Sequence, residues 1–153
     1  MHIKKLDHSA LVVRDLDVAR WFYGDVLGLE EIPRPSNFTF GGAWYRGDGF
    51  ELHLLLEADT STRAGFGDGG EGAKVGMVHH LGLEVDDLQE TERYLREHGV
   101  TIIGGPMPRG DGPIQLYVAD PDGNFLEFFQ RDGAPSLPIV ERGAVRLAPG
   151  TPR

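Results

Sequence analysis

Three histidines and one glutamate occupy matching places in the two halves of the sequence. His8 and His80 each open an apolar stretch that leads into an Asp-Leu pair, and His53 and Glu127 each stand four residues after the glycine of an Asp-Gly pair. Neutral imidazoles and carboxylates are ligands for divalent ions. Three imidazoles and one carboxylate from equivalent places therefore predict a site for one divalent ion.

Each of these residues also has a purely structural explanation. A histidine on a strand is more often a hydrogen-bonded structural residue than a metal ligand. Glu127 stands inside the apolar run 125–129, where burying an unpaired carboxylate costs several kcal/mol, so either that face is hydrated or a cation compensates the charge. Glu51 points to the same side of its strand as His53 and is an alternative oxygen ligand. The repeat, which makes the four positions equivalent, favours metal binding.

The composition suits one compact domain and limits the choice of metal. Of the 153 residues 40% are hydrophobic, enough for an ordinary core shared by two half-modules. The chain has no cysteine, which excludes disulfides, thiolate nucleophiles and sulfur ligands. The remaining ligand types suit Zn, Ni, Co, Fe and Mn nearly equally.

The charge balance argues against nucleic acid as a partner. The formal net charge is −9, and no basic stripe is present to attract a phosphate backbone. The first residues lack an apolar core of signal-peptide length, and no apolar run approaches a membrane span. We therefore expect a small-molecule substrate, no nucleic acid, no membrane and a cytoplasmic location.

The two halves predict the same order of elements: a strand, a helix and three more strands. The first helix begins after Asp15 or Asp17 and ends at Gly28. The second is capped by Asp87 and ends at Gly99. The first strand of each half begins near its histidine, and apolar runs between Gly and Pro residues predict the other strands. Strands are expected at 6–13, 29–32, 38–45, 50–56, 100–103, 114–119 and 124–130.

The resulting fold class is α+β, with two tandem βαβββ modules that form a curved mixed-sheet cup. The modules span 1–57 and 78–131, a glycine-rich linker that is also a candidate lid spans 58–77, and a C-terminal extension without a counterpart spans 132–153. Side chains alternate along a strand, so the four candidate ligands point away from the apolar faces that helices would cover. They are therefore expected to line the concave side of the sheets.

Three stretches of the chain resemble the vicinal oxygen chelate superfamily. They are the Leu-Asp-His run at 6–8, the Phe-Tyr-Gly-Asp-Val-Leu-Gly-Leu run at 22–29 and the Asp-Pro-Asp-Gly-Asn-Phe-Leu-Glu run at 120–127. The likeness covers nearly all of residues 5–131. This superfamily includes glyoxalase I, extradiol dioxygenases, methylmalonyl-CoA epimerase, fosfomycin-resistance thiol transferases and bleomycin-binding proteins.

The resemblance implies both a site and a function. Metal ligands in that superfamily lie on the first and last strands of each module, which correspond here to His8, His53, His80 and Glu127. Its members bind two adjacent oxygens of a substrate at open metal positions and stabilise the anion that forms. By similarity to glyoxalase I, Glu127 acts as the base and the favoured activity is that of a glyoxalase-like lyase or isomerase. Relatives often build the site across a subunit interface, so a homodimer is also expected.

Departures from individual relatives keep two other functions open. Glyoxalase I commonly has glutamate in place of His53, and fosfomycin-modifying enzymes need a hydroxyl where this chain has Ala10. An extradiol ring-cleaving dioxygenase needs two histidines and one carboxylate around iron, with acid–base partners for which Tyr45 and Tyr117 are candidates. A non-catalytic drug-binding or resistance protein would normally lack the ligands.

Aromatic and basic side chains are candidates for substrate contacts. Phe38, Phe40, Trp44 and Tyr45 surround a turn of small residues and could line the pocket mouth, although core packing explains them equally well. Arg109 adjoins a Pro-x-Pro segment and could hold a substrate carboxylate. The full set of substrate-binding candidates is Phe40, Trp44, Tyr45, Arg109 and Tyr117.

Overall fold

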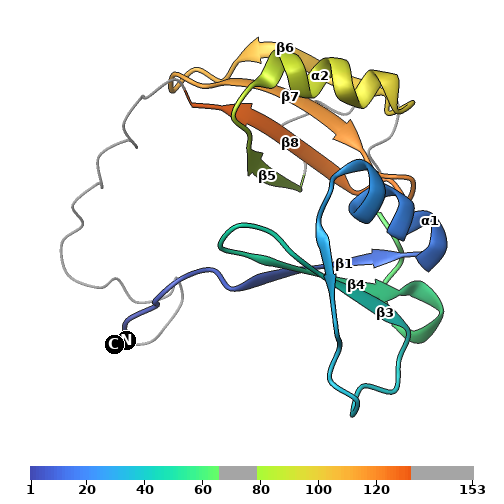
Figure 1. Ribbon diagram of the computed structural model, residues 1–153. Coiled ribbons are helices and arrows are strands. Elements are labelled where there is room, and N and C mark those ends of the chain that lie inside the picture. The colour runs from blue at the N-terminus through green and yellow to red at the C-terminus, as the bar shows by residue number, and fades with distance from the viewer. Residues whose placement is uncertain (66–78, 132–153) are drawn as a thin grey trace, which may run out of the picture.

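A computed structural model of the chain describes residues 1–65 and 79–131, which form two modules with the same order of elements (Figure 1). Most of the predicted linker and the predicted C-terminal extension lie outside the described residues. The two tandem βαβββ modules expected from the repeat are confirmed. Each module has its own four-stranded mixed sheet.

The first module has the strand order β1-β4-β3-β2, with β1 parallel to β4 and the other neighbours antiparallel. Asp15 caps its helix, because its Oδ1 accepts hydrogen bonds from the backbone N–H groups of Asp17 and Val18. Gly28, with a φ of 69°, reverses the chain after the helix. Its elements are β1 (His8–Val13), α1 (Leu16–Arg20), the π-helical turn η1 (Trp21–Val26), β2 (Glu30–Ile32), β3 (Gly42–Arg46), β4 (Glu51–Leu56) and the short 3₁₀ turn η2 (Glu57–Asp59).

The second module repeats this topology in the order β5-β8-β7-β6. Asp87 caps its helix by accepting from the N–H of Glu90, as predicted. The strand expected at 100–103 is longer than predicted, because it shifts register around Gly104 and then continues along β7. The elements are β5 (His80–Glu84), α2 (Leu88–Glu97), β6 (Ile102–Pro108), β7 (Ile114–Ala119) and β8 (Phe125–Gln130).

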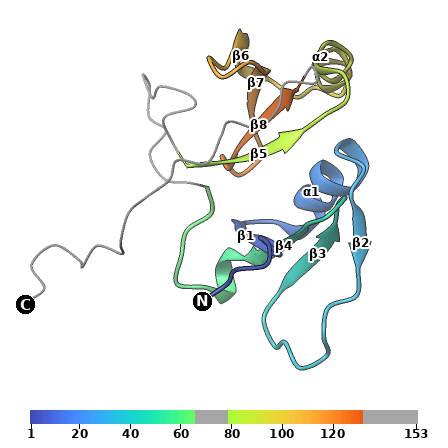
Figure 2. The ribbon, with the colours of Figure 1, turned by 90° about the vertical axis from the view of Figure 1, so that its left-hand side faces the viewer.

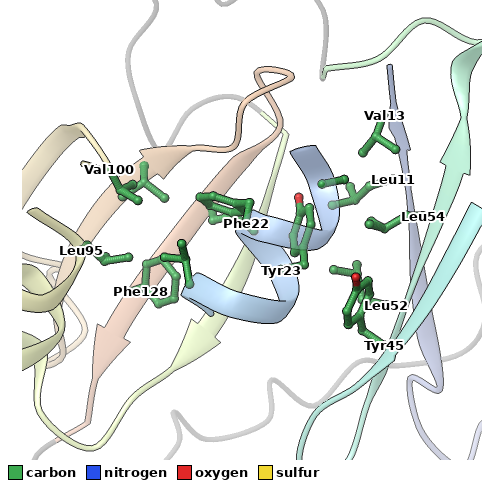
Figure 3. Close-up of a cluster of buried hydrophobic side chains, with 14 of the residues drawn as sticks. Leu11, Val13, Phe22, Tyr23, Tyr45, Leu52, Leu54, Leu95, Val100 and Phe128 are labelled. Atoms are coloured by element: carbon green, nitrogen blue, oxygen red, sulfur yellow. The ribbon is translucent and has the colours of Figure 1, made fainter. Parts of the chain in front are cut away.

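One hydrophobic core joins the modules, with α1 and its continuation lying between the two sheets (Figure 2). Phe22 and Tyr23 are 1% and 0% exposed. Figure 3 places Phe22 toward Phe128 of the second module and Tyr23 toward Leu11 and Leu54 of the first. The apolar face of each sheet is thus turned toward the helices, and the opposite face, here called its open face, is covered by no α-helix of the described residues.

A buried polar link adds to this apolar contact. Tyr23 Oη donates a 2.7 Å hydrogen bond to Asp120 Oδ2, and Asn124 Nδ2 donates to the same carboxylate oxygen and to the carbonyl of Val12. Burial, followed by the charge of Asp120, raises the pKa of Tyr23 well above its usual value, so the phenol remains a donor. The turn that leads into β8 is therefore fixed to the first module.

No helix within the described ranges is long and apolar enough to cross a membrane. The cytoplasmic location stays a prediction.

Candidate functional site

The open face of the first sheet carries a stack of three aromatic rings. In the parallel pairing of β1 with β4, Ala10 is opposite His53, so His8 lies two residues before that position on the same face. The His8 and His53 rings are stacked, with centroids 4.3 Å apart and planes 15° apart. Trp44 stacks on the other side of His53 at 3.9 Å and 5°. The plane of the His53 ring is fixed by this arrangement.

Carboxylates border both histidines of this stack. Glu51 Oε2 is 3.2 Å from His53 Nε2, and Asp7 Oδ2 is 3.3 Å from His8 Nδ1. The hydrogen bond with His53, followed by that from Arg46, lowers the pKa of Glu51. Glu51 therefore contacts the candidate ligand His53 as an anion and remains an alternative oxygen ligand.

The open face of the second sheet carries the matching pair. Gly82 is opposite Glu127 in the parallel pairing of β5 with β8, and His80 again lies two residues before that position. His80 Nε2 is 2.9 Å from Glu127 Oε2, and Tyr117 Oη donates to the same oxygen at 3.3 Å. Burial, followed by the charge of Glu127, raises the pKa of Tyr117, which keeps its phenol protonated. Glu127 itself is only 5% exposed.

A fixed cation completes the surroundings of this carboxylate. Arg109 Nη1 donates to Glu127 Oε1 at 3.4 Å, while its Nε and Nη2 donate to the two oxygens of Asp111 at 2.7 and 2.8 Å. The guanidinium also lies over the ring of Phe129, 4.5 Å from its centroid. The hydrogen bonds to Asp111 contribute most to raising the pKa of Arg109.

The four predicted metal ligands thus form two equivalent pairs on two sheets. Within residues 1–65 and 79–131, no three histidine, aspartate or glutamate side chains lie close enough to hold one ion. The donor types suit a divalent cation, and the charge of the buried Glu127 carboxylate is also paired with Arg109. The stacked rings of His8 and His53 direct their nitrogens along separate parallel planes, so both can bind one ion only if a ring turns. His8, whose side chain is 50% exposed, has room to do so.

The structure separates the predicted substrate-binding residues into two groups. One group, Trp44, Tyr117 and Arg109, contacts the candidate ligands directly. Phe40 belongs to the same group, because Phe38 contacts the rings of both Phe40 and Trp44. Tyr45 lies apart from them, because it pairs with Leu52 on the face turned to the helices and is 1% exposed. The strand alternation that placed His53 on the open face also places Tyr45 in the core.

Two residues near the site were not among the predicted candidates. Asp111 holds Arg109, and its only sequence signal is the Arg-x-Asp spacing. Gln115 is 8% exposed and lies on the same strand face as Tyr117, and its Oε1 has no hydrogen-bond partner in the part of the chain that the structure describes. A buried amide oxygen without a partner is an acceptor for a donor group of a ligand.

Comparisons with known proteins agree with this arrangement of modules. The sequence profile of the Glyoxalase/Bleomycin resistance protein/Dioxygenase superfamily matches residues 5–128. "Glyoxylase I 4" of Arabidopsis thaliana is 28% identical over 92% of this chain and 78% of its own length. A lactoylglutathione lyase of Neisseria meningitidis is 30% identical over 83% of this chain and 91% of its own length. A putative glyoxalase family protein of Bacillus anthracis has a similar structure, with a TM-score of 0.68, 26% identity and coverage of 86% of this chain and 98% of that one.

Proposed function

Because the chain belongs to the Glyoxalase/Bleomycin resistance protein/Dioxygenase superfamily, we propose that it is a divalent-metal-dependent enzyme, specifically a glyoxalase-like lyase or isomerase. Its substrate is a small molecule that chelates the ion through adjacent oxygens. The observation that carries the proposal is the His80–Glu127 pair, 2.9 Å apart with a buried carboxylate, at the position equivalent to the His8–His53 pair.

His8, His53, His80 and Glu127 would hold the ion. With three neutral imidazoles and one carboxylate its net charge would be near +1, and it would supply polarisation of a substrate carbonyl and acidification of the adjacent C–H. Zn, Ni, Co, Fe and Mn all suit this donor set, and supply in the cell decides among them.

We infer that Glu127 is the base, and that it would accept the substrate proton once it has left the ion. The hydrogen bonds from Tyr117 to Oε2 and from Arg109 to Oε1 orient the carboxylate for this step. The side chains of His80, Tyr117 and Arg109 cover the carboxylate, which is 5% exposed.

The complete site lies at a homodimer interface. Each pair of ligands lies on the open face of its own sheet, and neither pair has a third ligand among the described residues. A second copy that brings its His80–Glu127 pair to the His8–His53 pair supplies all four. Leu6 and Ile3, which precede β1 and are 79% and 75% exposed, offer apolar surface for that contact.

Elemental analysis of protein purified without chelator or affinity tag tests the metal. About one divalent ion per chain is expected from the single four-ligand set. His80→Ala and Glu127→Gln should each abolish retention of the ion, and Glu51→Gln should leave it intact as the matched carboxylate control. A Glu127→Gln variant that keeps stoichiometric metal would overturn the ligand assignment.

A mixed dimer tests the shared site. Co-expressed chains carrying His8→Ala in one and His80→Ala in the other form dimers in which one site has lost two ligands and the other is intact. Such dimers should retain metal at half the wild-type content, whereas each variant alone retains none. If each ligand set came from a single chain, the mixed dimer would hold no metal.

A ring-cleaving dioxygenase is the second candidate. The observation that favours it is Tyr117, a protonated phenol 3.3 Å from a carboxylate that neighbours a histidine. Iron in the purified protein would direct assays to catechol cleavage, and nickel, cobalt or zinc to lyase assays. Protein that contains no metal and takes up none would instead be a non-catalytic binding protein of this superfamily.

A further inference from the structure

We propose that Arg109 is a positioning residue that holds one oxygen of Glu127, restricts this carboxylate to binding the ion through its other oxygen, and so keeps two coordination positions open for a chelating substrate. This inference rests on the proposed function, since it concerns the ion that Glu127 helps to hold. Arg109 and Asp111 would then determine whether the ion can bind a substrate through two oxygens or only through one.

The two oxygens of Glu127 have different partners. Oε2 faces His80 Nε2 at 2.9 Å and also accepts a hydrogen bond from the neutral Tyr117 hydroxyl at 3.3 Å. Oε1 faces Arg109 Nη1 at 3.4 Å. A cation that joins His80 and Glu127 therefore meets Oε2, while Oε1 is already engaged by a guanidinium that repels a second cation.

Arg109 keeps its place without help from Glu127. Two hydrogen bonds of 2.7 and 2.8 Å join it to Asp111 in a forked arrangement, and its backbone N–H donates to the carbonyl of Pro113 at 2.8 Å. Its guanidinium lies over Phe129 at 4.5 Å. Arg131 lies over the same ring at 5.3 Å but pairs with Glu84, so it offers a matched cation at the site edge.

The number of Glu127 oxygens that bind the ion determines how many positions remain for the substrate. A carboxylate binds a metal through one oxygen or through both. With three imidazoles and one oxygen of Glu127, a six-coordinate ion keeps two free positions, which a molecule with two adjacent oxygens fills. If both oxygens of Glu127 bind, one position remains and chelation is lost.

Cobalt-loaded protein tests this role without a catalytic assay. The visible absorption of Co²⁺ reports its ligands, so the dissociation constants of two probes can be measured by titration. Acetohydroxamate binds through two adjacent oxygens, and azide binds through one atom. Arg109→Gln should weaken acetohydroxamate binding by about tenfold, in line with the loss of other residues that orient metal ligands, and leave azide binding unchanged. Arg109→Lys, which keeps the charge but loses the forked contact with Asp111, should fall between Arg109→Gln and wild type.

The outcomes separate this inference from the proposed function. Arg131→Gln should bind both probes as wild type does, because Arg131 pairs with Glu84. Cobalt-loaded Arg109→Gln that binds acetohydroxamate as tightly as wild type would overturn the role of Arg109 and leave the metal enzyme standing. Parallel loss of azide and acetohydroxamate would overturn it too, because the whole site would then be damaged. Wild-type protein that takes up no cobalt would overturn the proposed function and this inference with it.

Discussion

Replacing Tyr23 by phenylalanine removes the hydrogen bond that joins the first helix to the turn before β8. The ring keeps its packing at 0% exposure, so the change isolates one 2.7 Å hydrogen bond to a carboxylate. Such a bond contributes about 1.5–3 kcal/mol to the free energy of unfolding. Asp120 retains three other donors, the backbone N–H groups of Asp122 and Asn124 and the amide of Asn124, so the low end applies.

The expected loss of about 1.5 kcal/mol corresponds to a melting temperature lower by about 3–6 °C for a chain of this size. The assay is thermal unfolding followed by circular dichroism at neutral pH, with urea unfolding as a second measurement. Tyr45→Phe is the matched control, because Tyr45 is equally buried but its hydroxyl is 3.4 Å from Glu31 Oε2. Equal melting temperatures for the two variants would refute the reasoning that the Tyr23–Asp120 bond holds the modules together.

Three further predictions concern the pH dependence of stability and the space around the site. Burial, followed by the charge of Glu31, raises the pKa of Tyr45 to about 12. The contribution of its protonated phenol to stability is therefore complete below pH 10, its ordinary pKa, and is lost as the pH rises through about 12. Alkaline unfolding of wild type and Tyr45→Phe should differ between these two pH values. The hydrogen bond from Arg109 lowers the pKa of Asp111. The contribution of the Asp111 carboxylate to the free energy of unfolding is therefore present above its ordinary pKa of 3.8 and is lost as the pH falls through the lowered pKa. The difference in urea midpoint between wild type and Asp111→Asn should shrink in acid. A methyl group at Gly82 would meet only ordinary contacts, 3.7 Å from Phe129 and 4.0 Å from Glu127, so Gly82→Ala should bind cobalt normally. The larger side chain of Gly82→Leu should block uptake of both cobalt and acetohydroxamate. Titration of each variant with both ligands measures the difference.

The sequence was most informative where a local rule applied to a repeated segment. The sequence predicts Asp15 or Asp17 as the cap of the first helix and Asp87 as the cap of the second, and the structure has Asp15 and Asp87. An aspartate before an amphipathic run satisfies free N–H groups whatever the surrounding fold. The faces of His53 and Glu127 followed from alternation along a strand. Alternation also puts Trp44 and Tyr45 on opposite faces of β3, although their aromatic character makes both candidates for the pocket mouth.

Boundaries were less predictable where backbone irregularities intervene. The strand expected at 38–45 begins only at Gly42, and the strand expected at 100–103 runs from Ile102 to Pro108. A register shift between paired strands depends on the partner strand, and nothing in a single stretch of sequence specifies it.

The sequence by itself determined the two modules, their topology and the equivalence of His8 with His80 and of His53 with Glu127, because repeated patterns of apolar residues and caps act within each half. Only the tertiary structure decided which side chains contact one another. These contacts are the stacking of Trp44 on His53, the hydrogen bond from Tyr23 to Asp120, and the hydrogen bonds from Arg109 to Asp111 and Glu127. Each of these contacts joins side chains whose distance depends on how strands and helices pack, and packing is a property of the whole chain.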